Sequence, residues 1–235
     1  VIQSARPGVS PVRYVRVYTG RTMAADISTR ELATEYACGS VSPGLALLMS
    51  AHAETSPEGR RRIATAESLA GALLKEAPDA RMDDAALEAT LAMLDGPSAP
   101  TAAEPPALET GPLPRPVIEA ANLGFDRIPW RTRLPGVSEY VLEGFGPEKV
   151  SLLRARPGAR VPQHTHDGCE YTLVMTGAMQ DGARMFRRGD IAVNDEDDDH
   201  RPEIVGEELC YCLIVLEGRL RFTGRFSRAL NYLAE

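Results

Sequence analysis

Three of the four histidines in this chain stand close to one glutamate in the second half of the sequence. The stretch HTHDGCEYTLVMTG (164–177) contains His164, His166 and Glu170, and His200 follows at the end of an acidic run. Side chains two residues apart on a strand point to the same face, and the intervening DG allows a bend before Glu170. Two imidazoles and a carboxylate on one face form a ligand set for a first-row transition metal, which His200 would complete from a neighbouring strand.

Imidazole and carboxylate ligands suit Zn, Fe, Mn, Ni and Cu. We therefore expect one divalent transition metal, with zinc as the first choice and Mn, Fe or Ni as alternatives. No catalytic residue stands out beside this set, although Tyr171 and the acidic run 195–199 are candidate acid–base groups. Cys169, next to Glu170, is either a redox-sensing thiol or a small buried residue.

The ligand set lies among short apolar stretches separated by glycines. These stretches predict strands in the ranges 149–158, 169–177, 183–190, 191–195, 209–218 and 220–224. Regular short strands with turn signals between them are typical of an antiparallel barrel or sandwich. Cys210 and Cys212 fall in one of the apolar runs and are expected in the core. The last residues, 227–235, are predicted to form a short helix.

The first half of the chain has the pattern of short helices. Ser28 begins a capping-box pattern, and Ser42 and Ser56 are each followed by a proline, as at helix N-termini. A fourth helix is expected from about Asp83. Residues 23–94 contain six Lys/Arg and eleven Asp/Glu, so this helical domain is acidic and lacks the basic stripe of a DNA-binding protein.

Two composition changes divide the chain. Residues 1–22 carry four arginines and no acid, which indicates a disordered leader or a true start at Met23. Residues 95–116 contain seven prolines, which predicts an extended linker without a helix. The expected organisation is thus an α + β multidomain protein, with a helical domain at 23–94 and an all-β domain at 117–235.

Composition also limits the function classes. The formal charge of −7 argues against direct nucleic-acid binding through phosphate neutralisation. No apolar run reaches the ~18 residues of a membrane span. Four cysteines are too few for a disulfide scaffold. These features favour a soluble protein of the reducing cytoplasm.

The residues around the histidines resemble the cupin family. Residues 158–177 fit the first cupin motif, G-x5-H-x-H-x3-E-x6-G, at every fixed position. Residues 187–200 resemble the second motif, with Gly189 and His200 in place but without its usual proline and asparagine. The resemblance implies a double-stranded β-helix barrel with four metal ligands inside its mouth: His164, His166, Glu170 and His200.

The order of helices, proline-rich linker and single cupin resembles the ChrR-type anti-sigma factors over about residues 28 to 225. In that family, the N-terminal domain holds an extracytoplasmic-function sigma factor inactive. The C-terminal cupin senses oxidative stress, such as singlet oxygen or organic hydroperoxides. The resemblance implies a regulator of transcription with a sigma factor as its partner, and the cupin is a candidate surface for a homodimer.

This chain departs from the family in the zinc motif of the helical domain, H-x3-C-x2-C. His52 matches the histidine, whereas Ser56 and Gly59 stand at the cysteine positions. One ligand of four cannot hold a structural zinc, so no zinc is expected in this domain. We expect His52 to be a satisfied core histidine and the helical domain to fold on its own apolar contacts.

Three classes of function are left open. A regulator would dock its helices on a sigma factor through stripes such as Leu45, Leu48 and Met49, while the linker lets the cupin move relative to them. A metal-dependent cupin enzyme, a dioxygenase or an isomerase, would need an accessible metal and acid–base groups. A non-catalytic module would bind a metal or small molecule and carry a vestigial helical domain.

Overall fold

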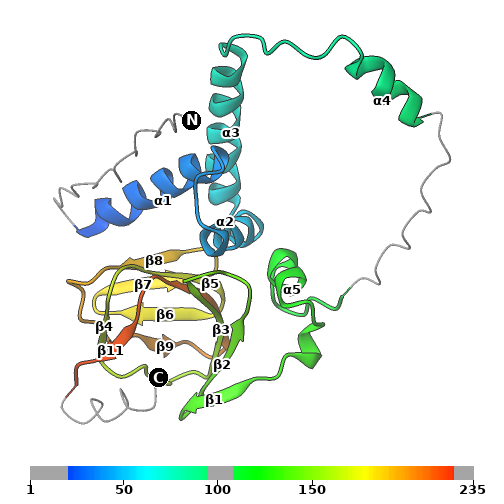
Figure 1. Ribbon diagram of the computed structural model, residues 1–235. Helices are drawn as coiled ribbons and strands as arrows, with labels where there is room; N and C mark the ends of the chain where they lie inside the picture. The colour runs from blue at the N-terminus through cyan, green and yellow to red at the C-terminus, as the bar shows by residue number, and fades with distance from the viewer. Residues whose placement is uncertain (1–20, 95–107, 225–235) are drawn as a thin grey trace, which may run out of the picture.

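The computed structural model describes residues 21–94 and 108–224. The leader up to residue 20, most of the proline-rich linker and the terminal helix predicted at 227–235 lie outside these ranges. The described chain places helices before strands (Figure 1). The helices are α1 (Arg21–Ala37), α2 (Pro43–Thr55), α3 (Pro57–Lys75), α4 (Ala86–Leu94) and α5 (Arg115–Ala121), followed by a 3-10 turn, η1 (Phe125–Arg127).

The predicted starts of α2 and α3 are confirmed, whereas that of α1 is wrong. The Ser42 hydroxyl accepts a hydrogen bond from the backbone N–H of Leu45, and the Ser56 hydroxyl accepts one from Gly59. Ser56 also ends α2, so one residue separates the two helices. Helix α1 begins at Arg21 and passes through Ser28, because the residues before that serine include good helix formers, Met23, Ala24 and Ala25.

Helix α5 corrects the expectation that residues 95–116 hold no helix. It begins at Arg115, inside that range, and carries Pro116 in its first turn. A proline is tolerated there because the N–H groups of the first turn have no partner within the helix. The helix ends at Asn122, whose left-handed backbone (φ 50°) stops the chain before it enters the barrel.

The second half of the described chain is a β-barrel of antiparallel strands. A six-stranded sheet has the order β1-β2-β3-β10-β5-β8, and it faces a three-stranded sheet β7-β6-β9 and a two-stranded sheet β11-β4. The described chain thus has a helical N-terminal half followed by a cupin-like barrel. The strands are β1 (Arg131–Leu134), β2 (Val137–Leu142), β3 (Lys149–Ala155), β4 (His164–His166), β5 (Glu170–Thr176), β6 (Ala178–Asp181), β7 (Arg184–Arg187), β8 (Ile191–Asn194), β9 (Glu203–Val205), β10 (Cys210–Leu216) and β11 (Leu220–Phe222).

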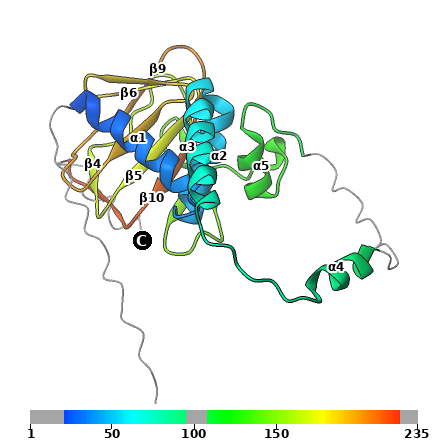
Figure 2. The same ribbon diagram turned by 90° about the horizontal axis from the view of Figure 1, so that it is seen from above.

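The helices and the barrel share one hydrophobic core. Helix α2 packs on β5 and β10, and α1 packs near β8, so both cover the outer face of the six-stranded sheet (Figures 1 and 2). Side chains of α1, α2, α5 and this sheet form a single buried cluster, and a smaller cluster fills the barrel. The expectation that the helical half folds on its own contacts is therefore wrong.

The same packing removes the predicted docking stripe. Leu48 and Met49 are fully buried and Leu45 is nearly so, because this face of α2 meets the barrel. The large apolar side chains that α3, α4 and the connection between them expose lie further along: Leu69, Leu73, Leu74, Met82, Leu87, Leu91, Met93 and Leu94. None of the residues of α4 is buried, and Figures 1 and 2 show this helix standing away from the rest.

No helix within the described ranges combines the length and the apolar character that crossing a bilayer requires. The longest, α3, has 19 residues but carries charged side chains along its first turns.

Candidate metal centre

The four residues singled out from the sequence come together inside the barrel. His164 and His166 lie on β4, Glu170 begins β5, and His200 pairs with His164 through an isolated β-bridge. Gly168 makes the bend between β4 and β5 with a φ of 119°, and a side chain there would meet the backbone oxygen of Glu217 at 2.5 Å. Glycine is required at this bend, which turns Glu170 back toward the two histidines.

The ligand atoms of these residues converge on one point. One nitrogen or carboxylate oxygen from each of the four side chains lies within 4.8 Å of the others. The Nε2 atoms of His166 and His200 are 3.4 Å apart, and His166 Nε2 lies 3.2 Å from Glu170 Oε2. Ligands around a tetrahedral zinc ion, at bond lengths of 2.0–2.1 Å, are separated by about 3.3 Å. These two separations therefore fit one small cation.

Neighbouring acceptors orient two of the imidazoles. His164 Nδ1 lies 2.8 Å from the carbonyl oxygen of Pro162, and His200 Nδ1 lies 2.7 Å from Asp181 Oδ2. A proton on each Nδ1 satisfies these acceptors and leaves the Nε2 lone pair available to a metal. His166 Nδ1 is buried without a hydrogen-bond partner.

The electrostatics favour the metal-binding forms of two ligands. Burial, together with the nearby positive charge of a protonated His200, lowers the pKa of His164 to about 4. Burial alone would raise the pKa of Glu170, but its hydrogen bond with His166 and the charges of the histidines outweigh this and bring it to about 2. At neutral pH the imidazole is thus neutral and the carboxylate ionised, as metal coordination requires.

Asp181 is a member of the site that the sequence did not reveal. Burial lowers the pKa of His200, but the hydrogen bond and negative charge of Asp181 outweigh this, so that the pKa is raised. Asp181 ends β6 and thus joins the three-stranded sheet to the site. The signal available in advance was the DG pair at 181–182, which indicates a hairpin turn but not its proximity to His200.

The site is closed off from solvent. His164, His166 and Glu170 are at most 6% exposed, and the His200 side chain is 8% exposed. Strand β11 pairs with β4 and sets Phe222 opposite His164 and Leu220 opposite His166. The apolar neighbours on β11 therefore lie on the same face as the ligands.

The cysteines take different positions around the site. Cys210 and Cys212 are fully buried, as predicted, with their Sγ atoms 3.6 Å apart in the barrel core. Cys169 is half-buried, forms no disulfide, and packs against the larger core cluster, the one shared with the helices. Its side chain belongs to the outer side of the sheet, whereas Glu170 belongs to the site.

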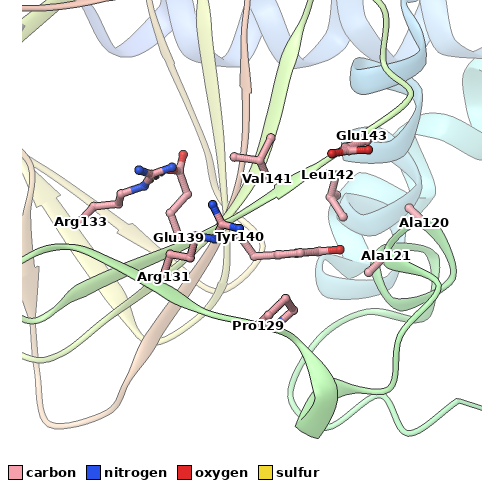
Figure 3. A pocket seen from close by; sticks show the side chains of 10 residues that line it. All are labelled: Ala120, Ala121, Pro129, Arg131, Arg133, Glu139, Tyr140, Val141, Leu142 and Glu143. Atoms are coloured by element: carbon pink, nitrogen blue, oxygen red, sulfur yellow. Dashed lines mark hydrogen bonds and ion pairs between the residues drawn. The ribbon is translucent and has the colours of Figure 1, made fainter. Parts of the chain in front are cut away.

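A cavity of ≈ 380 Å³ lies apart from the metal centre, between the end of α5 and the strands β1 and β2 (Figure 3). None of the four convergent residues lines it. Two arginines, Arg131 and Arg133, and two glutamates, Glu139 and Glu143, are among the lining residues; Arg133 is ion-paired with Glu139 at 2.9 Å, whereas Glu143 lies at the opposite end beside Ala120 (Figure 3). The lining charges cancel, so the cavity favours neither an anion nor a cation.

Comparisons with known proteins agree with this architecture. Residues 119–219 match the family described as the ChrR cupin-like domain. The chain is 30% identical over 195 residues to the anti-sigma-E factor ChrR of Cereibacter sphaeroides, covering 81% of this chain and 89% of the relative.

One solved structure covers both halves of the chain. The crystal structure of Rhodobacter sphaeroides SigE in complex with the anti-sigma ChrR superposes with a TM-score of 0.68 at 28% identity, covering 80% of this chain and 96% of that chain. An RmlC-like cupin from Ralstonia eutropha matches 43% of this chain and 70% of its own, at 18% identity and a TM-score of 0.38.

Proposed function

Since the chain belongs to the ChrR family of anti-sigma factors, we propose that it is a cytoplasmic transcription regulator that binds an extracytoplasmic-function sigma factor. The observation that carries this proposal is the exposed apolar set on α3 and α4. The relative is named as an anti-sigma factor, and the similar solved chain is bound to SigE. The described helices of this chain offer a surface suited to the same kind of partner.

The exposed leucines on α3 and α4 follow helical spacing. Leu69 and Leu73 are four residues apart on α3, at 59% and 65% exposure. Leu87, Leu91 and Leu94 follow an i, i+4, i+7 pattern on α4. Such spacing places each set on one face of its helix. Apolar helix faces of this kind are buried when a partner helix or groove covers them.

The charge of the same segment points to a basic partner. Residues 76–94 contain five acidic side chains and one basic one. A sigma factor contacts DNA, so its surface carries the basic residues that neutralise phosphate. Acidic residues around an apolar centre would steer such a surface into contact and raise the association rate.

The partner surface is tested by placing a charge on it. Leu73→Glu should weaken binding of the proposed sigma-factor partner by at least tenfold, because burying a leucine contributes ~1.5–3 kcal/mol. Leu209→Glu, at an exposed leucine on the barrel, is the matched control and should bind as the wild type. Isothermal titration with both purified proteins measures the difference. Equal affinities for the wild type and Leu73→Glu would count against this surface.

We further propose that the barrel holds one divalent metal through His164, His166, Glu170 and His200. The convergence of the four side chains, their burial and the lowered pKa of His164 support this. Three imidazoles and a carboxylate are borderline ligands that suit zinc, with Mn, Fe or Ni as alternatives. A bound ion would supply Lewis acidity and would tie β4, β5 and the His200 loop together.

Metal analysis of the purified full chain tests this site. The wild type should contain about one equivalent of metal, and His166→Ala should lose most of it because at most three ligands are left. Thr165→Ala removes a neighbouring side chain on β4 that bonds the Glu196 carbonyl instead, and should keep the metal. A wild type that neither contains nor takes up Zn, Mn, Fe or Ni would contradict the proposal.

The oxidant signal of this regulator is proposed to act at the metal centre or at Cys169. This thiol packs against the core shared with the helices, so its oxidation would introduce a polar group into the contact between the two halves. Cys169→Ser should then weaken the release of the sigma factor by peroxide, whereas Cys38→Ser, at an exposed thiol on the helical side, should leave it unchanged. Identical release by all three proteins would assign the signal to the metal centre.

An enzymatic role receives less support from the site. The four ligands are buried, and apolar residues of β11 lie beside two of them. A substrate would need a path to an open coordination position. Metal-dependent oxygen uptake with a small organic substrate would favour the enzyme, and its absence in the metal-loaded chain would favour the regulator.

A further inference from the structure

Helix α2 is attached to the barrel at both of its ends. At its N-terminus, the Glu148 carboxylate accepts hydrogen bonds from the Ser42 hydroxyl and from the backbone N–H of Gly44. A side chain at Gly44 would meet Val150 and Val215 at 2.8 and 3.0 Å, so the helix backbone rests directly on the sheet. This end is fixed by charge and close packing together.

At its other end, α2 meets the turn that leads into β8. Gly189 lies in this turn with a φ of 88°, and a side chain there would come within 3.0 Å of Thr55 and Ser56. The segment from His52 to Gly59, which we call the elbow, contains the single residue that separates α2 from α3. The orientation of α3 relative to the barrel is therefore set where the elbow touches the Gly189 turn.

The side chain at the centre of this contact is His52. It is 5% exposed and its Nδ1 has no hydrogen-bond partner, while the Gly189 backbone hydrogen-bonds its ring. A side chain at Gly59 would come within 2.2 Å of His52 Nε2. The imidazole thus occupies the space that the missing side chain of Gly59 leaves, and it reaches across the elbow to the barrel.

A buried histidine with one unpaired nitrogen is costly, because each unsatisfied polar atom loses its hydrogen bonds to water. An apolar side chain would fill this space without that cost. The imidazole provides what an apolar group cannot, namely a hydrogen bond to the barrel from within the elbow. An apolar residue at position 52 would fill the same space, so the hydrogen bond to the barrel is what distinguishes His52.

We propose that His52 is a positioning residue that couples the partner-binding helix α3 to the metal barrel by holding the elbow against the Gly189 turn. This inference rests on the proposed function, and it adds the route by which the barrel influences the partner surface. The turn continues into β8, which pairs with β5 so that Asn194 lies opposite Glu170. A change at the metal centre thus has a short path through two paired strands to the elbow.

The elbow is tested with two glycine variants on α3. Gly59→Ala should push the His52 ring out of its place, whereas Gly71→Ala adds the same methyl group where nothing lies within 4 Å. Both changes favour helix by up to about 1 kcal/mol, so helix propensity is matched. In the full metal-loaded chain, hydrogen exchange of the elbow and of residues 187–190 should accelerate at least tenfold in Gly59→Ala alone. Unchanged protection in Gly59→Ala would overturn the proposal.

The coupling is tested by the ratio of sigma-factor affinities with zinc-loaded and metal-free protein. We expect a ratio of fivefold or more for the wild type and for Gly71→Ala, in the usual range of coupling between sites, and a ratio within twofold of unity for Gly59→Ala. His52→Gln retains a donor for the Gly189 carbonyl and should keep part of the wild-type affinity ratio. His52→Leu has no such donor and should lose the ratio. If Gly59→Ala keeps the wild-type ratio, the coupling is refuted. A purely structural role of His52 would change the sigma-factor affinities of the zinc-loaded and the metal-free protein equally and would leave their ratio unchanged.

Failure of the proposed function gives a different result. If the wild type binds no sigma factor in either metal state, the proposed function and the coupling both fall. The hydrogen-exchange comparison still decides whether His52 holds the elbow, because it requires no partner.

Discussion

Replacing Asp181 by alanine is the sharpest test of the metal centre, because it leaves all four convergent residues in place. Asp181 accepts a hydrogen bond from His200 at 2.7 Å, and its side chain is 11% exposed. Loss of such an outer partner typically lowers metal affinity 10- to 100-fold. We therefore expect Asp181→Ala to bind zinc roughly 10- to 100-fold more weakly, which corresponds to about 1.4–2.7 kcal/mol.

The same free energy should appear as a loss of thermal stability in saturating zinc, because a metal that binds only the folded chain stabilises it in proportion to the logarithm of its affinity. For a chain of this size, 1 kcal/mol shifts the melting temperature by about 2–4 °C. The expected decrease is thus roughly 3–11 °C in zinc. Competition with a chromophoric chelator measures the affinity, and calorimetry measures the melting temperature.

Two companion variants separate the causes. Asp197→Ala removes an exposed acid from the run that precedes His200 and should alter zinc affinity less than twofold. Asp181→Asn keeps an oxygen that can accept the hydrogen bond but loses the charge, so it should fall between the wild type and Asp181→Ala. If Asp181→Ala and Asp197→Ala bind zinc equally well, the orientation of His200 by Asp181 plays no part in metal binding.

Three further predictions concern the helical half. Burial, together with Arg62, lowers the pKa of His52 against the opposing effects of the Gly189 backbone and Asp190. The unfolded chain therefore takes up the proton first, and stability falls as the pH drops below about 6.5. His52→Gln should thus lose less stability than the wild type between about pH 7.5 and about pH 5.5 in urea unfolding, and equal losses would contradict this. Ser42→Ala should cost ~1 kcal/mol in the same assay through its lost cap, whereas the exposed Ser68→Ala should be nearly neutral. Metal analysis of the full chain should find one zinc, and a second zinc that disappears on mutation of His52 would disprove the prediction of a zinc-free helical domain.

The convergent residues were predictable because their spacing already determines their geometry. His164 and His166 are two residues apart on one strand and therefore share a face, and the DG that follows permits the bend that Gly168 makes. Patterns within a short stretch of chain carry this kind of information. The ligand types also indicate that His200 could complete the set from a neighbouring strand, but its pairing with His164 joins distant parts of the chain, and no local pattern predicts that pairing.

The hydrogen bond between Asp181 and His200 and the burial of α2 against the barrel could not be predicted from local spacing. The apolar stripe of Leu45, Leu48 and Met49 indicates correctly that one face of the helix is buried, but it does not tell whether the barrel or a partner covers it. The pairs Pro135–Gly136 and Asp181–Gly182 are turn signals. The strands β1 and β6 that precede them have only four residues each, which is too short for a clear alternating pattern, so the sequence does not predict these two hairpins.

The shared core imposes an order on the biosynthesis of this protein. A ribosome releases α2 long before β10, the strand on which it packs. Until Cys210–Leu216 has emerged, the buried face of α2 has no permanent cover, and an apolar helix in that state is prone to aggregation. Strand β4 likewise has no partner until β11 has emerged, near the end of the described chain. The nascent chain therefore exposes this apolar face until the barrel strands have emerged.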